Sequence, residues 1–219
     1  MIQALIFDFD GLILDTEQSE FQAWQEVYAE HSVYLPLEQW ALCIGGAAEL
    51  FDPYAYLESL VGRPVQREEI AVKRRRRHLE LLAKQSVLPG VIDYLNDAKR
   101  LGLKLAVASS SSRSWVVGHL SQLGLLTYFD YIRCGDEVAR KKPDPELYLA
   151  VLAALGVSAN QAIVLEDSPN GILAARRANI FCVAIPNPLT SQLSLEQANL
   201  RLASLADMSL EQLIAKVQQ

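Results

Sequence analysis

The sequence predicts an α/β protein with a doubly wound, Rossmann-like parallel sheet core and an inserted α-helical domain. Three observations predict this fold class. Short apolar runs end abruptly in polar residues, segments of helical periodicity separate the runs, and one long segment after the first run holds no convincing strand. The chain has 219 residues, 51% of them hydrophobic. A chain of this size buries roughly 70% of the surface that it exposes when unfolded, so it can be stable without disulfides.

Four apolar runs rich in β-forming residues are typical of central strands in a parallel sheet. They lie at residues 4–7, 103–108, 162–165 and 181–185, and a weaker candidate lies at 131–134. Because parallel neighbours need crossover connections, the segments between the runs should be helices that cover the faces of the sheet.

Helical periodicity fills those gaps at residues 91–101, 114–123, 145–155 and 170–178. Gly102, Gly124 and Gly156 follow three of these segments, where helices commonly end. A capping box formed by Ser209 and Gln212 opens a last helix. The sheet domain is therefore predicted to comprise residues 1–15 and 87–219.

The segment 16–86 should form a second, all-helical domain inserted after the first strand. Phe21, Trp24 and Tyr28 fall at positions i, i+3 and i+7, which is the spacing of one helix face. A later set, Tyr54, Leu57, Leu60 and Val61, continues that spacing.

The composition excludes several function classes. A net charge of −6 gives no general attraction to nucleic acid or to anionic lipid, and no apolar stretch reaches the roughly 20 residues of a membrane span. No basic segment precedes Asp8, so a secretory signal is not expected and the predicted compartment is the cytoplasm. Cys43, Cys134 and Cys182 are odd in number and widely spaced, which predicts reduced thiols.

Carboxylates follow two of the predicted strands, at the sheet edge where ligands of open α/β sheets bind. Asp8 and Asp10 point to the same side of an extended backbone, and Glu166 and Asp167 end another strand. Taken singly, each is typical of a turn or a helix cap. Four such groups in one crevice would repel one another, so together they predict a divalent cation with oxygen ligands. An EF-hand does not fit, because Ile6 would occupy its first ligand position.

The same residues suit phosphoryl transfer. Asp8 could attack phosphorus as a nucleophile with Mg²⁺ holding it, and Asp10 could protonate the leaving group and then deprotonate water. Ser109, with Ser110 beside it, ends the second long run and suits a phosphoryl oxygen. Lys142 precedes a rigid proline and a helix start, which mounts a cation for a phosphate. Alone, the serines would be a helix-capping turn and the lysine a solvated side chain.

The ordered set of motifs resembles a known family. Asp8-Phe9-Asp10-Gly11, then Ser109, then Lys142-Pro143, then Glu166-Asp167 are similar to the four motifs of the haloacid dehalogenase-like (HAD) hydrolase superfamily. The match is closest over residues 6–17 and 165–171, and it spans the chain in order. Within the superfamily, residues 16–86 look like the small α-helical cap of the branch that contains β-phosphoglucomutase and many sugar-phosphate and nucleotide phosphatases.

The resemblance implies a role for each acidic residue. Asp8 would be the phosphorylated nucleophile and a Mg²⁺ ligand, and Asp10 the general acid/base that ligates the metal through its backbone carbonyl. Asp167 would ligate Mg²⁺, and Glu166 would ligate it or orient its water. The presence of Asp10 argues against dehalogenation, because a halide leaving group needs no proton.

The resemblance also places Ser109 and Lys142 on the phosphoryl group and makes the helical segment a lid that selects the substrate. That segment carries five consecutive cations and a histidine at 73–78. Five consecutive helical residues span more than one full turn, so at least one cation should face the cleft; we expect Arg75 or Arg76 to contact substrate. The histidines share no spacing and are expected at the surface or in packing.

Glu17 and Glu20 are further candidate substrate contacts. Mutases of this family carry His shortly after the first motif and Arg after a cap glycine, whereas this chain has Glu20 and Ala48 there, although Gly45 and Gly46 match. Phosphate transfer to water is therefore favoured over mutase activity, which stays an alternative, as does a catalytically silent binding module.

The predicted function is a Mg²⁺-dependent phosphatase that acts on a small phosphomonoester, with a sugar or polyol phosphate expected before a nucleotide. No nucleic-acid or membrane partner is expected. The chain is expected to be a monomer, with a homodimer as the alternative.

Overall fold

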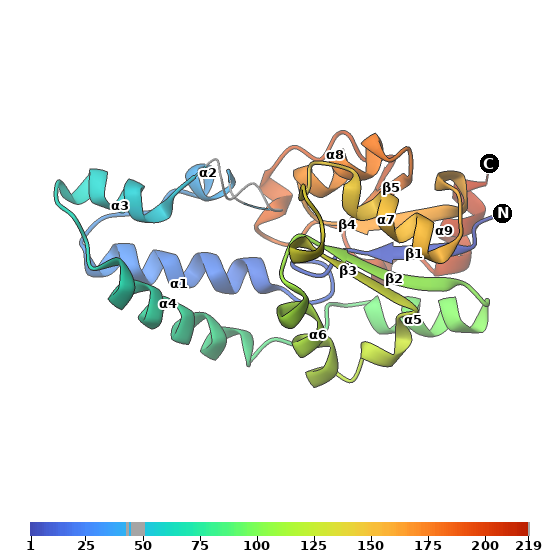
Figure 1. Cartoon of the computed structure of the whole chain (residues 1–219), viewed down its shortest axis with the longest axis horizontal. Coiled ribbons are helices and arrows are strands. Elements are labelled where there is room, and N and C mark those ends of the chain that lie inside the picture. Colours follow the sequence, from blue (N-terminus) through green and yellow to red (C-terminus); the bar gives the residue numbers. More distant parts are fainter. Residues whose placement is uncertain (43, 45–50, 219) are drawn as a thin grey trace.

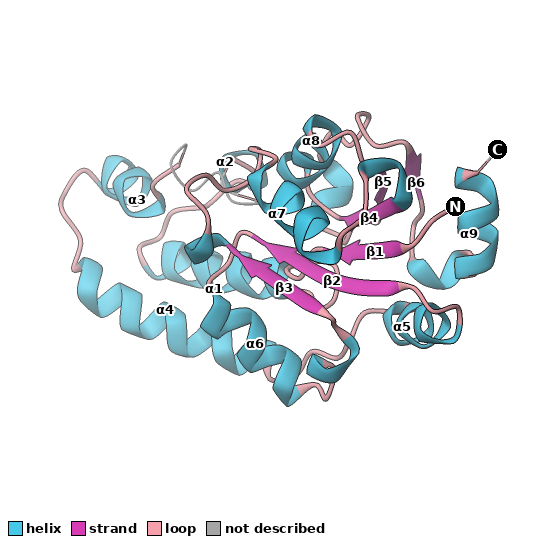
Figure 2. Ribbon diagram, turned by 45° about the vertical axis from the view of Figure 1, so that its right-hand side comes forward, coloured by secondary structure: helices cyan, strands magenta, loops and turns pink. Residues whose placement is uncertain are grey.

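The computed structural model describes residues 1–42, 44 and 51–218. Its centre is a parallel sheet with the strand order β3-β2-β1-β4-β5-β6 (Figure 2). The strands are β1 (Ala4–Phe7), β2 (Lys104–Ser109), β3 (Tyr131–Cys134), β4 (Ala162–Glu166), β5 (Phe181–Ala184) and β6 (Leu200–Arg201). The doubly wound α/β fold is confirmed, and β6 was not predicted because two residues carry no readable pattern.

Helices cover both faces of the sheet, as the sequence periodicity predicts. They are α5 (Val91–Arg100), α6 (Arg113–Gln122), α7 (Glu146–Leu155), α8 (Pro169–Arg177) and α9 (Leu210–Val217), with short 3₁₀ helices at Leu126–Tyr128, Gly135–Glu137, Ala159–Gln161, Thr190–Gln192 and Leu205–Asp207. Along β1, Leu5 and Phe7 enter one hydrophobic cluster while Ala4 and Ile6 enter the other. Since burying a large apolar side chain stabilises a fold by about 1.5–3 kcal/mol, this two-sided burial holds the central strand in place.

Residues between β1 and α5 form α1 (Thr16–Glu30), α2 (Leu37–Trp40), α3 (Pro53–Val61) and α4 (Arg67–Leu82), which extend from one end of the sheet (Figure 1). Phe21, Trp24, Tyr28 and Leu57 are buried in a hydrophobic cluster of this region, as predicted. The later set falls on α3, where Leu57 is buried and Leu60 is 42% exposed. The domain limits at 16 and 86 stay a prediction.

The chain leaves and re-enters the sheet region at one place. Leu14 forms an antiparallel bridge with Val87, and the amide of Leu88 donates to the Ile13 carbonyl at 3.0 Å. The two connections to the helical region are therefore hydrogen-bonded neighbours.

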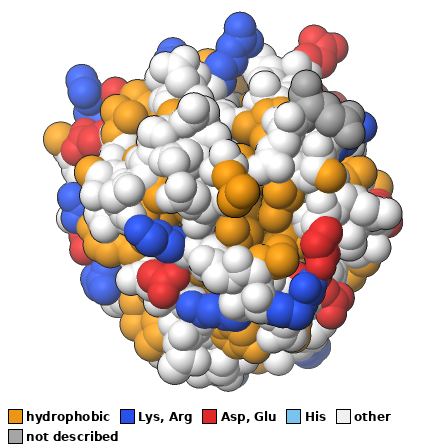
Figure 3. All heavy atoms as spheres, turned by 90° about the vertical axis from the view of Figure 1, so that its right-hand side faces the viewer, with side chains coloured by type: hydrophobic (Ala, Val, Ile, Leu, Met, Phe, Trp, Pro, Cys, Tyr) orange, Lys and Arg blue, Asp and Glu red, His pale blue; other side chains and the backbone are white. Residues whose placement is uncertain are grey.

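Cys134 and Cys182 are buried free thiols, as predicted, and Cys43 lies outside the described residues. No helix in the described part of the chain has both the length and the hydrophobicity to cross a membrane. At the end of the molecule that carries both termini, basic and acidic side chains are interspersed (Figure 3).

Candidate active site

A buried lysine and three carboxylates meet at the carboxyl ends of β1, β2 and β4. In the register, Phe7 pairs with both Val107 and Leu165, which sets Asp8 level with the end of each neighbouring strand. The Lys142 ammonium donates to Asp8 Oδ1 at 2.5 Å, to Glu166 Oε1 at 2.6 Å and to the carbonyl of Ala108 at 2.8 Å. The sequence prediction that these elements converge is thus matched by the geometry.

The acidic group carries more negative charge than its lysine balances. One oxygen each of Asp8, Glu166 and Asp167 lies within 4.8 Å of the others, and all three residues are buried. Burial raises the pKa of Asp8 to about 8; Lys142 opposes the shift, and the charges of Glu166 and Asp10 add to it. Burial and the charges of Glu166 and Asp8 also raise the pKa of Asp167 well above its usual value. Three carboxylates against one ammonium suit a divalent cation with oxygen ligands.

Hydrogen bonds fix the orientation of Glu166. Its Oε1 accepts from the Tyr148 hydroxyl at 2.8 Å, and its Oε2 accepts from the Ser168 hydroxyl at 3.1 Å and from the amide of Asp167 at 3.0 Å. The Asn187 amide donates to Asp167 Oδ2 at 2.9 Å. Tyr148 and Asn187 were not predicted, because their side chains arrive from a helix interior and from a loop.

Gly171 packs directly against Glu166. A Cβ at this position would lie 1.7 Å from Oε1, and that carboxylate is fully buried. We expect Gly171→Ala to displace Glu166 and to lower stability by about 2–3 kcal/mol, as overpacking does. For a protein of this size, that lowers the Tm by about 4–12 °C in a thermal melt.

Gly118→Ala is the matched control for this prediction. Gly118 is also helical, and its Cβ would meet no atom within 4 Å. The control should melt at or above the wild-type temperature. Equal melting temperatures for the two variants would contradict the predicted clash.

Asp10 lies apart from the Lys142 cluster and accepts four side-chain hydrogen bonds. Oδ1 accepts from the Thr16 hydroxyl and from the Trp115 indole, each at 2.9 Å. Oδ2 accepts from Ser111 at 2.7 Å and from Ser109 at 3.1 Å. The carboxylate is therefore held at the junction of the sheet and the helical region.

The predicted phosphate-binding serines are near Asp10. Ser109 is fully buried, and besides its bond to Asp10 its hydroxyl accepts from the amide of Ser111 at 3.0 Å. The buried Ser110 hydroxyl has no partner among the residues that the structure describes.

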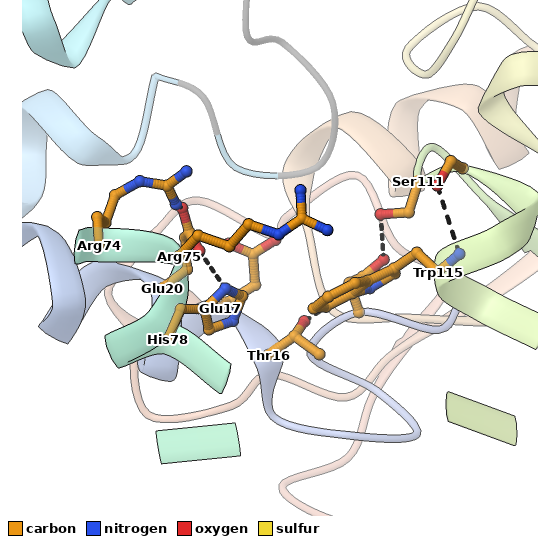
Figure 4. A pocket seen from close by; sticks show the side chains of 10 residues that line it. Thr16, Glu17, Glu20, Arg74, Arg75, His78, Ser111 and Trp115 are labelled. Atoms are coloured by element: carbon orange, nitrogen blue, oxygen red, sulfur yellow. Dashed lines mark hydrogen bonds and ion pairs between the residues drawn. The ribbon is translucent and has the colours of Figure 1, made fainter. Parts of the chain in front are cut away.

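A pocket of about 420 Å³ opens between the sheet domain and the helical region (Figure 4). The core contributes Asp10, Ser111, Ser112 and Trp115, and the helical region contributes Thr16, Glu17, Glu20, Arg74, Arg75 and His78. Burial, with the charges of Asp10 and Asp8, raises the pKa of Glu17 well above its usual value. Glu17, Glu20 and Arg75 thus lie where substrate contacts were predicted.

The two candidate arginines differ in position. Arg75 lines the pocket, and across the described residues no ion pair involves it. Arg76 instead pairs with Glu80 at 3.1 Å, has a side chain that is 82% exposed and does not line this pocket. The rotation of α4 about its axis therefore places Arg75 at the pocket. The expectation for Arg76 is corrected, because its side chain points to solvent and pairs with Glu80.

Arg74, His78, Thr16 and Trp115 are pocket residues that the sequence reading missed. His78 is buried and pairs with Glu20, so it follows the packing alternative that was expected for the histidines and not the surface one. The spacing of Arg74 and His78, four residues apart on one helix face, was the available signal.

The chain has an inserted helical region after the first strand, and a lysine and an acidic cluster lie at the carboxyl ends of its parallel sheet. This is the kind of site found in doubly wound α/β enzymes. The haloacid dehalogenase-like hydrolase model matches residues 5–185, and the chain belongs to this family. It is a hydrolase enzyme, as predicted, whose relatives include phosphatases.

YhcW of Bacillus subtilis, which is named as a phosphatase without an assigned substrate, is 48% identical over 98% of this chain and 97% of its own length. The crystal structure of CbbY from Rhodobacter sphaeroides in complex with phosphate is 31% identical, covers 98% of this chain and 100% of its own, and has a TM-score of 0.76. The β-phosphoglucomutase of Clostridium difficile is 25% identical over 100% of this chain and 98% of its own, with a TM-score of 0.76.

Proposed function

We propose that this chain is a Mg²⁺-dependent phosphatase that hydrolyses a small phosphomonoester through a phosphorylated Asp8. One observation carries the proposal: buried Asp8 contacts Lys142 at 2.5 Å within a carboxylate group whose charge is not balanced. A nucleophilic carboxylate, a fixed cation and a site for a divalent ion are the groups that phosphoryl transfer to a carboxylate requires.

The first half of the reaction forms the aspartyl phosphate. A carboxylate oxygen of Asp8 attacks phosphorus, and the bond between phosphorus and the ester oxygen breaks. Asp10 gives its proton to the departing alcohol oxygen. Lys142 compensates the charge on the phosphoryl oxygens, and Ser109 and Ser110 are proposed to donate hydrogen bonds to them.

The second half returns the free enzyme. Asp10, now ionised, takes a proton from water as the water oxygen attacks phosphorus. The bond between phosphorus and the Asp8 oxygen then breaks, which releases inorganic phosphate.

The donor set fits Mg²⁺. Asp8, Asp167 and the backbone carbonyl of Asp10 are the proposed ligands, and Glu166 either ligates the ion or orients its water. When bound, the ion supplies positive charge that neutralises the carboxylates and the phosphoryl oxygens.

We further propose that residues 16–86 are a cap that selects the substrate, with Arg75 as a substrate contact. Arg75 extends into the pocket beside Glu17 (Figure 4). Since a hydrogen bond to a charged group contributes about 1.5–3 kcal/mol, Arg75→Ala should lower kcat/KM on the best substrate by roughly 10- to 150-fold.

The control for Arg75 is Arg76→Ala, one residue along α4 and outside the pocket. It should stay within about twofold of wild type, as surface substitutions usually do. A kcat/KM for Arg75→Ala no lower than that of the control would refute the contact.

A phosphate-release screen over sugar phosphates and nucleoside monophosphates tests the function. Release should occur with Mg²⁺ and stop when the ion is chelated. No release from any substrate would favour a silent binding module. Conversion of β-glucose 1-phosphate to glucose 6-phosphate with little free phosphate would favour a mutase.

We prefer hydrolysis to mutase activity because Glu20 occupies the position of the mutase His. Its carboxylate pairs with Arg74 and His78 of the same chain. Gly45, Gly46 and Ala48 lie outside the described residues. Cytoplasmic location and the monomeric state stay predictions.

A further inference from the structure

His78 presents a buried ring nitrogen that lacks a protein partner at the substrate pocket. The residue is 8% exposed, lies on α4 and lines the pocket. Its Nδ1 pairs with Glu20 Oε2, whereas its Nε2 has no hydrogen bond among the described residues. A buried polar atom left unpaired costs about 1–3 kcal/mol, so a partner from outside the chain would recover this energy.

The contacts of Glu20 determine which ring nitrogen of His78 is left for a partner. Arg74 Nη1 forms an ion pair with Glu20 Oε1, so both oxygens of this carboxylate are bonded within the chain. Although burial raises the pKa of Glu20, its bond to His78 and the charge of Arg74 lower it below the usual value. Glu20 Oε2 accepts the hydrogen bond of His78 Nδ1, so Nε2 is the ring nitrogen left to bond a group from outside the chain.

The ring is fixed in place from both sides of the pocket. It lies 5.5 Å from the ring of Trp115 on the core side, and the same indole donates to Asp10. The guanidinium of Arg74 lies 5.1 Å from the centre of the Trp24 ring. This contact positions Arg74, which in turn pairs with Glu20. Trp115 therefore contacts both the imidazole and the proposed acid/base, and His78 and Trp115 are both drawn at the pocket in Figure 4.

We propose that His78 Nε2 forms a hydrogen bond with a hydroxyl of the substrate's alcohol portion, with Glu20 as the residue that positions the imidazole. The site then selects phosphomonoesters of polyhydroxylated alcohols, such as sugar and polyol phosphates, over esters without hydroxyls. This inference rests on the proposed phosphatase function and adds a specificity-determining residue to it.

The test compares kcat/KM for D-ribose 5-phosphate and D-glucose 6-phosphate with kcat/KM for 4-nitrophenyl phosphate, which has no hydroxyl on its alcohol portion. His78→Asn keeps a donor for Glu20 and removes the group at Nε2. We expect the ratio of the better sugar phosphate to 4-nitrophenyl phosphate to fall by about 10-fold, the size of one hydrogen bond. His78→Gln returns an amide that can hydrogen-bond a hydroxyl near the position of Nε2 and should recover part of the ratio.

Arg76→Ala, on the same helix outside the pocket, is the matched control and should leave the ratio within about twofold. Should His78→Asn fail to fold in a circular dichroism melt, His78→Leu takes its place, since it is apolar and similar in size.

Three results would overturn the inference. Wild type could favour 4-nitrophenyl phosphate over both sugars, the variant could lose activity equally on all three substrates, or the ratio could stay unchanged. Each leaves the phosphatase proposal intact. No phosphate release by wild type from any of the three would instead remove the proposed function and this inference together.

Discussion

Asp8→Asn should abolish turnover, with kcat lowered by on the order of 10⁴-fold or more, as removal of a nucleophile does elsewhere. The amide has nearly the same shape but does not attack phosphorus, so no aspartyl phosphate forms. Phosphate release with Mg²⁺ present measures the loss. Asp93→Asn is the control, because Asp93 is an exposed carboxylate on α5, far along the chain from the cluster.

The same variant separates chemistry from folding. Asp8 is one of three buried carboxylates near a single ammonium, and burial raises its pKa to about 8. Removing its charge relieves repulsion from Glu166, so Asp8→Asn should melt no lower than wild type in a chelator. Residual turnover above one hundredth of wild type would count against Asp8 as the nucleophile.

Lys142→Met should cost both stability and activity. The ammonium contacts Asp8 and Glu166 and is 3% exposed, so its removal leaves buried carboxylates without a counter-charge. Breaking such a buried pair costs about 3–5 kcal/mol, which for a protein of this size lowers the Tm by about 6–20 °C. Phosphate release should fall at least 100-fold, about the value of two charge-assisted hydrogen bonds.

Lys141→Met is the matched control for Lys142, since it removes an exposed lysine from the neighbouring position. Added Mg²⁺ should recover part of the lost Tm in Lys142→Met, because a bound cation supplies the missing charge. If the two variants have the same Tm, the buried ammonium does not stabilise the cluster.

The core of the site was predictable because local sequence determines it. An apolar run that stops at Asp8, and another that stops at Glu166 and Asp167, must bring these carboxylates to one edge once the strands are parallel and adjacent. The register of β1 with β4 meets that expectation. Lys142 was found the same way, from a rigid connection before a helix.

The pocket side of the site was less predictable. Which of the cations in 73–78 faces the cleft depends on the rotation of α4 about its axis, and packing against α1 decides that rotation. Trp115 donates to Asp10 although the two residues are 105 positions apart in the sequence. A short sequence motif cannot predict a contact between residues so far apart. Asn187 reaches Asp167 from the loop after β5, where the apolar run has already ended.

The paired connections at Leu14 and Val87 bear on how such an enzyme can change its substrate. Since the polypeptide departs and returns through adjoining positions, the intervening stretch can be lengthened, shortened or exchanged without rerouting any strand. Asp8, Lys142, Glu166 and Asp167 lie outside that stretch, whereas Glu20, Arg75 and His78 lie within it. Under the proposed roles of these residues, reactivity and selectivity would be able to diverge independently during evolution of this architecture.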